Sequence, residues 1–148
     1  MKMQIINARG SNRKGAILSM ELVLILPIFL LLVFSIVEFS MLMSAHTRVV
    51  NAAQNGSRMM CISGANESEV KERVTSLLGA SLAKDCLIQV YPANYAGEIG
   101  RVAIRVPMRN ASPDLLWMTG FSLQDRSIDA DAPMVMERTA SKELPDQY

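Results

Sequence analysis

The sequence predicts an α+β protein, in which a long N-terminal transmembrane helix continues into a small head with a second helix and a three-stranded antiparallel sheet. Residues 16–43 are almost wholly apolar, helical spacing of apolar side chains continues beyond them, and alternation typical of strands follows residue 86. We divide the 148 residues into a basic leader at 1–15, a transmembrane helix at 16–43, an extracytoplasmic head at 44–138 and a flexible tail at 139–148.

The apolar run predicts a single membrane span. As a helix it would be about 42 Å long at about 1.5 Å per residue, whereas the hydrocarbon core of a bilayer is about 30 Å thick. Four basic residues precede the run with no acidic residue among them: Lys2, Arg9, Arg13 and Lys14. The positive-inside rule therefore places the N-terminus in the cytoplasm and the head outside.

Two carboxylates interrupt the apolar run, Glu21 near its start and Glu38 near its end. An ionised side chain in mid-bilayer costs about 3 kcal/mol, so it is normally paired, lines an interface or lies near the surface. Glu21 either reaches the membrane surface or meets a cation. Pro27 lies between the two carboxylates and removes one helical hydrogen bond, which predicts a kink or a locally opened turn.

The segment RKGAILSMELVLILPIFLLLVFSIVEF resembles the TadE family of minor pseudopilins, which carry the class III signal of type IV pilins. The shared features are a basic pair, a small-residue junction, a glutamate, a proline and a second glutamate followed by phenylalanine: Arg13 and Lys14, Gly15 and Ala16, Glu21, Pro27, and Glu38 with Phe39. The resemblance implies a structural or priming component of a Tad-type pilus machine. It would be anchored in the cytoplasmic (inner) membrane, in or at the base of a pilus, with other pilin-like subunits as partners.

The resemblance also implies processing by a prepilin peptidase, which in this family cuts on the cytoplasmic side after the glycine and leaves the helix on the mature protein. The new α-amino group would then pair with Glu21 of a neighbouring subunit. Pilins place this glutamate fifth after the cut, whereas Glu21 is sixth when counted from Ala16. Cleavage after Ala16 would restore the usual spacing, so the bonds after Gly15 and after Ala16 both remain candidates.

An ordinary secretory signal is the alternative for the N-terminus. Such a signal has an apolar stretch of about 7–15 residues followed by a small-residue cleavage site. Here the run is longer, Glu38 breaks it, and Met43-Ser44-Ala45 matches the site poorly, so we expect the helix to be retained. A second class of function is a membrane-tethered binding or sensory module whose signal anchor is never cleaved.

Helical spacing continues into the head. Apolar and small residues recur every three or four positions from Ala45 to Met60, and we expect this stripe to pack against the head rather than a partner. Asn66 and Glu69 form a capping-box pattern for a second helix running to about Ala83. We expect one face of that helix to be buried: Val70, Val74, Leu77, Leu78 and Leu82.

Alternating side chains predict strands at 87–91, 101–108 and 128–136, with a hairpin loop at 93–100. Pro133 indicates that the third strand is at an edge or bulged. Between the last two strands, Ser112 as a cap and Gly120 as a stop predict a short helix. Its apolar side chains would either enter the membrane interface or close the bottom of the core, and we expect them to close the core. These side chains are Leu115, Leu116, Trp117, Met118 and Phe121.

Cys61 and Cys86 flank the second helix outside the membrane, where a disulfide between them would stabilise a small head by about 3 kcal/mol. A pair of buried thiols is the alternative. Two cysteines and His46 do not supply four zinc ligands. Asp125, Asp129 and Asp131 form an acidic cluster that lacks the glycine and closing glutamate of a calcium loop, and Asp129 and Asp131 suit the solvated face of a strand. We expect no metal, no cofactor, no enzymatic activity and, with a net charge of +1, no nucleic-acid partner.

Overall fold

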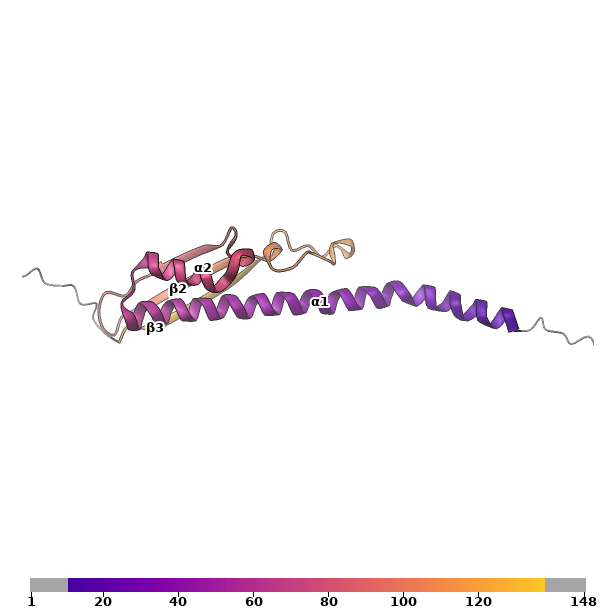
Figure 1. Cartoon of the computed structure of the whole chain (residues 1–148), viewed down its shortest axis with the longest axis horizontal. Helices are drawn as coiled ribbons and strands as arrows, with labels where there is room; N and C mark the ends of the chain where they lie inside the picture. Colours follow the sequence, from indigo (N-terminus) through magenta and orange to yellow (C-terminus); the bar gives the residue numbers. More distant parts are fainter. Residues whose placement is uncertain (1–10, 138–148) are drawn as a thin grey trace, which may run out of the picture.

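The computed structural model describes residues 11–137, with side chains from residue 19 onward. The first ten residues of the predicted leader and the whole predicted tail lie outside the described residues. The described chain is an α+β structure, as predicted, built along one long helix (Figure 1).

Helix α1 (Ser11–Ser63) has 53 residues and forms the spine of the molecule. At about 1.5 Å per residue it is about 80 Å long, so it extends far beyond the head (Figure 1). In the described part of the chain it is the one helix long and apolar enough to cross a membrane. The predicted continuation of the apolar helix into the head is confirmed.

Helix α2 (Glu67–Ala83) packs on the C-terminal part of α1. The predicted capping box is present, with Asn66 Oδ1 accepting from the Glu69 backbone N–H at 3.0 Å and the Glu69 carboxylate accepting from the Asn66 backbone N–H. One correction concerns Leu77, which is exposed, because only every fourth residue faces α1 and the sheet. The buried residues of α2 lie four positions apart: Val70, Val74, Leu78 and Leu82.

Three antiparallel strands form the sheet: β1 (Leu87–Tyr91), β2 (Ile99–Pro107) and β3 (Ser127–Val135), with β2 in the centre. One face packs on the helices and the other is open to solvent. Pro133 lies on the edge strand β3, as predicted. Strand β2 begins two residues earlier than predicted, because Gly100, which suggests a loop in the sequence, lies in the ladder opposite Met134.

The predicted helix at residues 112–121 is wrong. Only a single turn forms, η2 (Trp117–Thr119), because Asp114 has a φ of +56° and breaks the helical run. Gly120 ends the turn with a φ of +85°, which agrees with its predicted role as a stop. The expected core closure is also wrong, since Trp117 is 66% exposed and Met118 is 79% exposed.

The predicted disulfide is corrected as well, because Cys61 and Cys86 are free thiols at opposite ends of the sheet. Cys61 donates to the Met134 carbonyl at 3.3 Å and lies beside Gly100 of β2. Cys86 directly precedes Leu87, which pairs with Arg105 of β2. Five residues of β2 separate these ends, about 16 Å at about 3.3 Å per residue, whereas bonded cysteines have Cα atoms within about 7 Å. Burial raises the pKa of both thiols, which keeps them protonated.

The contact between α1 and α2 at Gly56 generates a prediction. A Cβ added at Gly56 would lie 2.8 Å from Val74 Cγ2. Such overpacking costs about 1–3 kcal/mol, whereas replacing a helical glycine by alanine gains about 1 kcal/mol, and the β-branched Val74 is too restricted to rotate away. Gly56→Ala should therefore lower the free energy of unfolding of the native chain and raise it in a Val74→Ala background.

The native chain, Gly56→Ala, Val74→Ala and the double variant are unfolded by denaturant in detergent and followed by circular dichroism. The free energies of unfolding show whether the effect of Gly56→Ala changes sign between the two backgrounds. Asn51→Ala, at an exposed position of the same helix, is the control and should act equally in both backgrounds. An equal effect of Gly56→Ala in the two backgrounds would contradict the close contact.

Candidate functional site

The N-terminal half of α1 exposes apolar side chains around its whole circumference. Every described residue from 19 to 32 is exposed, and the first buried residue along the helix is Glu38. A helix that is apolar on all sides must be covered by lipid or by other helices. This half of α1, which we call the apolar arm (residues 19–37), is therefore suited to the interior of a membrane or to contact with other apolar helices.

Glu21 lies exposed on the apolar arm, and Pro27 lies one and a half turns further along. The sequence has no Lys or Arg between Gly15 and Thr47, so no cation from the arm itself can pair with Glu21. α1 stays continuous through Pro27, and no turn opens there. Its N-terminal half bows gently in Figure 1. Because proline has no N–H, the Val23 carbonyl lacks its helical donor and can accept from a neighbour.

The residues predicted to direct processing fall within the first turns of α1: Arg13, Lys14, Gly15 and Ala16. They share one helix with Glu21, but their side chains lie outside the described set. The predicted processing residues, Glu21 and Pro27 all lie on one continuous helix.

Glu38 has a different environment from Glu21, because it is 1% exposed. Its Oε2 accepts a hydrogen bond from the Leu116 backbone N–H at 3.0 Å. The contact joins α1 to the connection between β2 and β3, 78 residues away in the chain. The sequence identified Glu38 as a second carboxylate in the apolar run, but it carried no signal for this partner.

Among the described residues, three buried side-chain oxygens have no hydrogen-bond partner: Glu38 Oε1, and Ser112 Oγ and Asp114 Oδ1 of the connection that Glu38 contacts. The other carboxylate oxygen of Asp114 accepts from the Leu123 backbone N–H at 3.4 Å, and Leu123 is fully buried. Glu38 thus accepts from the Leu116 N–H and Asp114 accepts from the Leu123 N–H, one on either side of residues 117–122. We call these two hydrogen bonds the Glu38 clamp.

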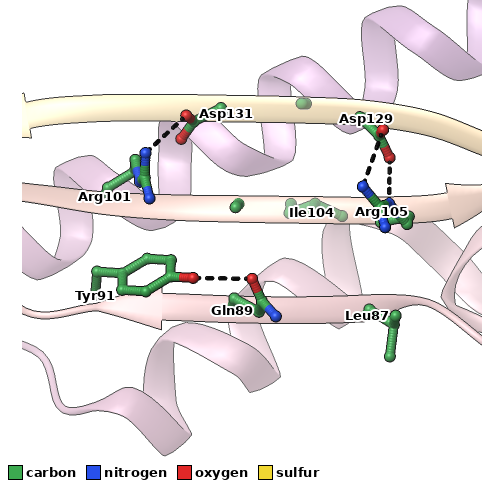
Figure 2. Close-up of a pocket in the computed structure, with 10 residues that line it drawn as sticks. Leu87, Gln89, Tyr91, Arg101, Ile104, Arg105, Asp129 and Asp131 are labelled. Carbon is green, nitrogen blue, oxygen red and sulfur yellow. Dashed lines mark hydrogen bonds and ion pairs between the residues drawn. The ribbon is translucent and has the colours of Figure 1, made fainter.

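The outer face of the sheet carries a shallow depression of about 320 Å³ (Figure 2). Arg105 is paired with Asp129 at 2.8 Å, and Arg101 with Asp131 at 3.4 Å. The Arg101 guanidinium also lies 4.8 Å from the centre of the Tyr91 ring. The predicted solvated face is confirmed for both aspartates.

These charges are already neutralised within the sheet. The hydrogen bond from Arg105 lowers the pKa of the Asp129 carboxyl, so the pair stays ionised at neutral pH. More than half of each side chain is exposed, and such pairs contribute little to stability. In the part of the chain that the structure describes, no group of three His, Cys, Asp or Glu is placed to hold a metal ion. The depression therefore offers a neutral contact surface.

The Glu38 clamp generates a prediction. Glu38→Ala removes the acceptor of the Leu116 N–H, and a hydrogen bond to a charged group is worth about 1.5–3 kcal/mol. Hydrogen exchange of the Leu116 amide should therefore become at least about tenfold faster. Exchange measured by mass spectrometry on the full chain in detergent tests this.

Glu98→Ala is the matched control, because Glu98 accepts from the backbone N–H groups of Asn94 and Tyr95 in a loop at the other end of the sheet. It should loosen that loop and leave Leu116 unchanged. Unchanged exchange at Leu116 in Glu38→Ala would contradict the clamp.

A comparison with known protein families gives a match that falls on α1. Residues 17–58 match the family TadE, described as TadE-like protein. The matched residues include Glu21, Pro27 and Glu38, and they end just after Gly56. No curated protein and no solved structure matches the chain. The resemblance to the TadE-like family is thus confirmed over residues 17–58 of α1, and it suggests a component associated with a Tad pilus.

Proposed function

We propose that this chain is a TadE-like minor pseudopilin, a structural or priming subunit of a Tad-type pilus machine. The observation that carries the proposal is the division of α1 into two halves. Its first half exposes an apolar surface with one carboxylate, and its second half is the buried spine of a small head. One rigid helix can thereby bundle with other subunits while the head remains outside the bundle.

In this proposal the N-terminus lies in the cytoplasm and the head lies on the other side of the inner membrane. The four leading cations favour that orientation. A prepilin peptidase cuts after Gly15 or Ala16, and the apolar arm stays on the mature protein. The partners are the peptidase and other pilin-like subunits.

Glu21 would set the register between subunits. Its carboxylate lies exposed on the arm, and the sequence supplies no Lys or Arg beside it after Gly15. The α-amino group created by cleavage is a cation at the correct end of the helix. In a bundle of low dielectric the pair attracts strongly, and either charge left alone is costly.

The second candidate is a membrane-tethered binding or sensory module with an uncleaved anchor. The depression on the outer sheet face favours it, since Tyr91 and Gln89 there could contact a partner. In that case the leader stays on the chain and Glu21 has no assembly role.

Processing separates the two candidates. The intact mass and N-terminal sequence of the chain from membranes should show loss of fifteen or sixteen residues only in cells that also make a prepilin peptidase, because the cut follows Gly15 or Ala16 in the printed sequence. The matched control replaces Gly15 by a bulky residue, Gly15→Trp, which should block cleavage after Gly15 by its size. A leader retained in both kinds of cell would overturn the proposal.

Glu21 substitutions test the registration step. Glu21→Ala and Glu21→Gln should both abolish pilus assembly, because each removes the charge and Gln keeps the size. Both variants should remain in the membrane, and a plain anchor would insert better without the carboxylate. Leu22→Ala, at the adjacent exposed position, should assemble normally. Sheared-pilus and membrane fractions are measured by immunoblot, and normal assembly by Glu21→Gln would exclude the charge pair.

A further inference from the structure

The connection between η1 (Met108–Asn110) and β3 places an apolar tip outside the head. Trp117 is 66% exposed and Met118 is 79% exposed. Figure 1 shows this orange segment extending past the sheet and running beside α1 toward the N-terminal end of that helix. We call residues 115–121 the tip.

The position of the tip along α1 is fixed by the Glu38 clamp. Leu116 donates its N–H to Glu38 Oε2 at 3.0 Å, and this bond lies at the base of the η2 turn that carries Trp117. Beyond the C-terminal end of the tip, the Leu123 N–H donates to Asp114 Oδ2. The tip therefore cannot move along the helix without breaking a buried hydrogen bond to a carboxylate.

In the proposed topology, Glu38 lies near the outer edge of the membrane span. A hydrocarbon core of about 30 Å needs about 20 helical residues. Counted from Gly15, directly after the last leading cation, the span ends at about residue 34, about one helical turn before Glu38. With the span placed in this way, the tip would lie on the membrane side of the head, close to the depth where lipid headgroups meet acyl chains.

The chemistry of the tip suits that depth. Tryptophan is enriched at membrane interfaces because its ring is apolar and its Nε1–H is polar. Met118 adds apolar surface beside it. Arg126 follows the tip in the chain, and its guanidinium lies 4.9 Å from the centre of the Phe121 ring. A cation beside the tip suits contact with lipid phosphates.

We propose that the tip is a second membrane contact, in which Trp117 and Met118 enter the interface of the leaflet on the head's side. The head is then held at two points, by α1 and by the tip, and its tilt on the membrane is fixed. Continuity with the lipid-covered apolar arm favours lipid over a second protein as the occupant. The inference rests on the membrane anchor of the proposed function and does not depend on filament assembly.

Trp117 is the only tryptophan in the sequence, so its fluorescence reports the tip alone. The full chain is placed in lipid nanodiscs at one chain per disc, with lipids brominated either near the headgroup or near the chain ends. We expect a blue-shifted emission that loses intensity with both lipids, and loses more with the shallow bromine. One chain per disc removes any neighbouring subunit as the cause.

The matched control moves the single tryptophan to the far end of the head. Tyr95 is 71% exposed in the loop at 92–98, and the double variant Trp117→Phe/Tyr95→Trp carries its reporter there. Its emission should be red-shifted, quenched by aqueous iodide and insensitive to lipid bromine. Trp117 in the native chain should respond in the opposite way to both quenchers.

Two results would overturn the inference. Quenching of Trp117 by iodide and not by lipid bromine would place the tip in water, and insensitivity to both would place it against protein. Flotation of the chain with lipid vesicles separates this failure from failure of the anchor. A chain that floats but leaves Trp117 in water retains the proposed anchor and loses only the second contact.

Discussion

The head depends on the close approach of α1 to both α2 and β2 at Gly56. A Cβ at this position would meet Val74 of α2 at 2.8 Å and Val102 of β2 at 3.5 Å. The absence of a side chain there lets three elements meet at one point, and the buried alanines one turn earlier extend the same contact. Each element alone would leave an apolar face in water, so the burial of all three along one stripe forms the core.

The same helix connects that core to the apolar arm, which is long and apolar enough to cross a membrane. α1 has no break between the apolar arm and the buried stripe, so a helix held at its N-terminal half orients the head rigidly. The Glu38 clamp adds a second connection, between α1 and the segment that carries Trp117. A buried carboxylate at this place is costly unless it is hydrogen-bonded, and the Leu116 N–H supplies one such bond. The chain thus uses its two apolar-run glutamates differently, one exposed and one buried.

The sequence predicted the helices and strands well, because their signals are local. The 3.6-residue period of α1 and α2, the Asn66 capping box and the two-residue alternation of β2 and β3 need no distant partner. Three predictions failed for reasons that are not local. Asp114 accepts from the Leu123 N–H, and its left-handed backbone replaces the expected helix. The α1 stripe left the 115–121 side chains outside the core, and the antiparallel register separated Cys61 from Cys86 by most of the sheet.

The sequence by itself determined the helix that is long and apolar enough to cross a membrane, its continuation into the head, and the TadE-like signature, since each depends on the order of residues along one helix. Only the tertiary structure decided what meets that helix from afar. Glu21 and Glu38 look alike as carboxylates in an apolar run. One is exposed and the other buried because a segment 78 residues away folds back onto Glu38, and no local pattern in the sequence encodes a hydrogen bond from a backbone N–H at that separation.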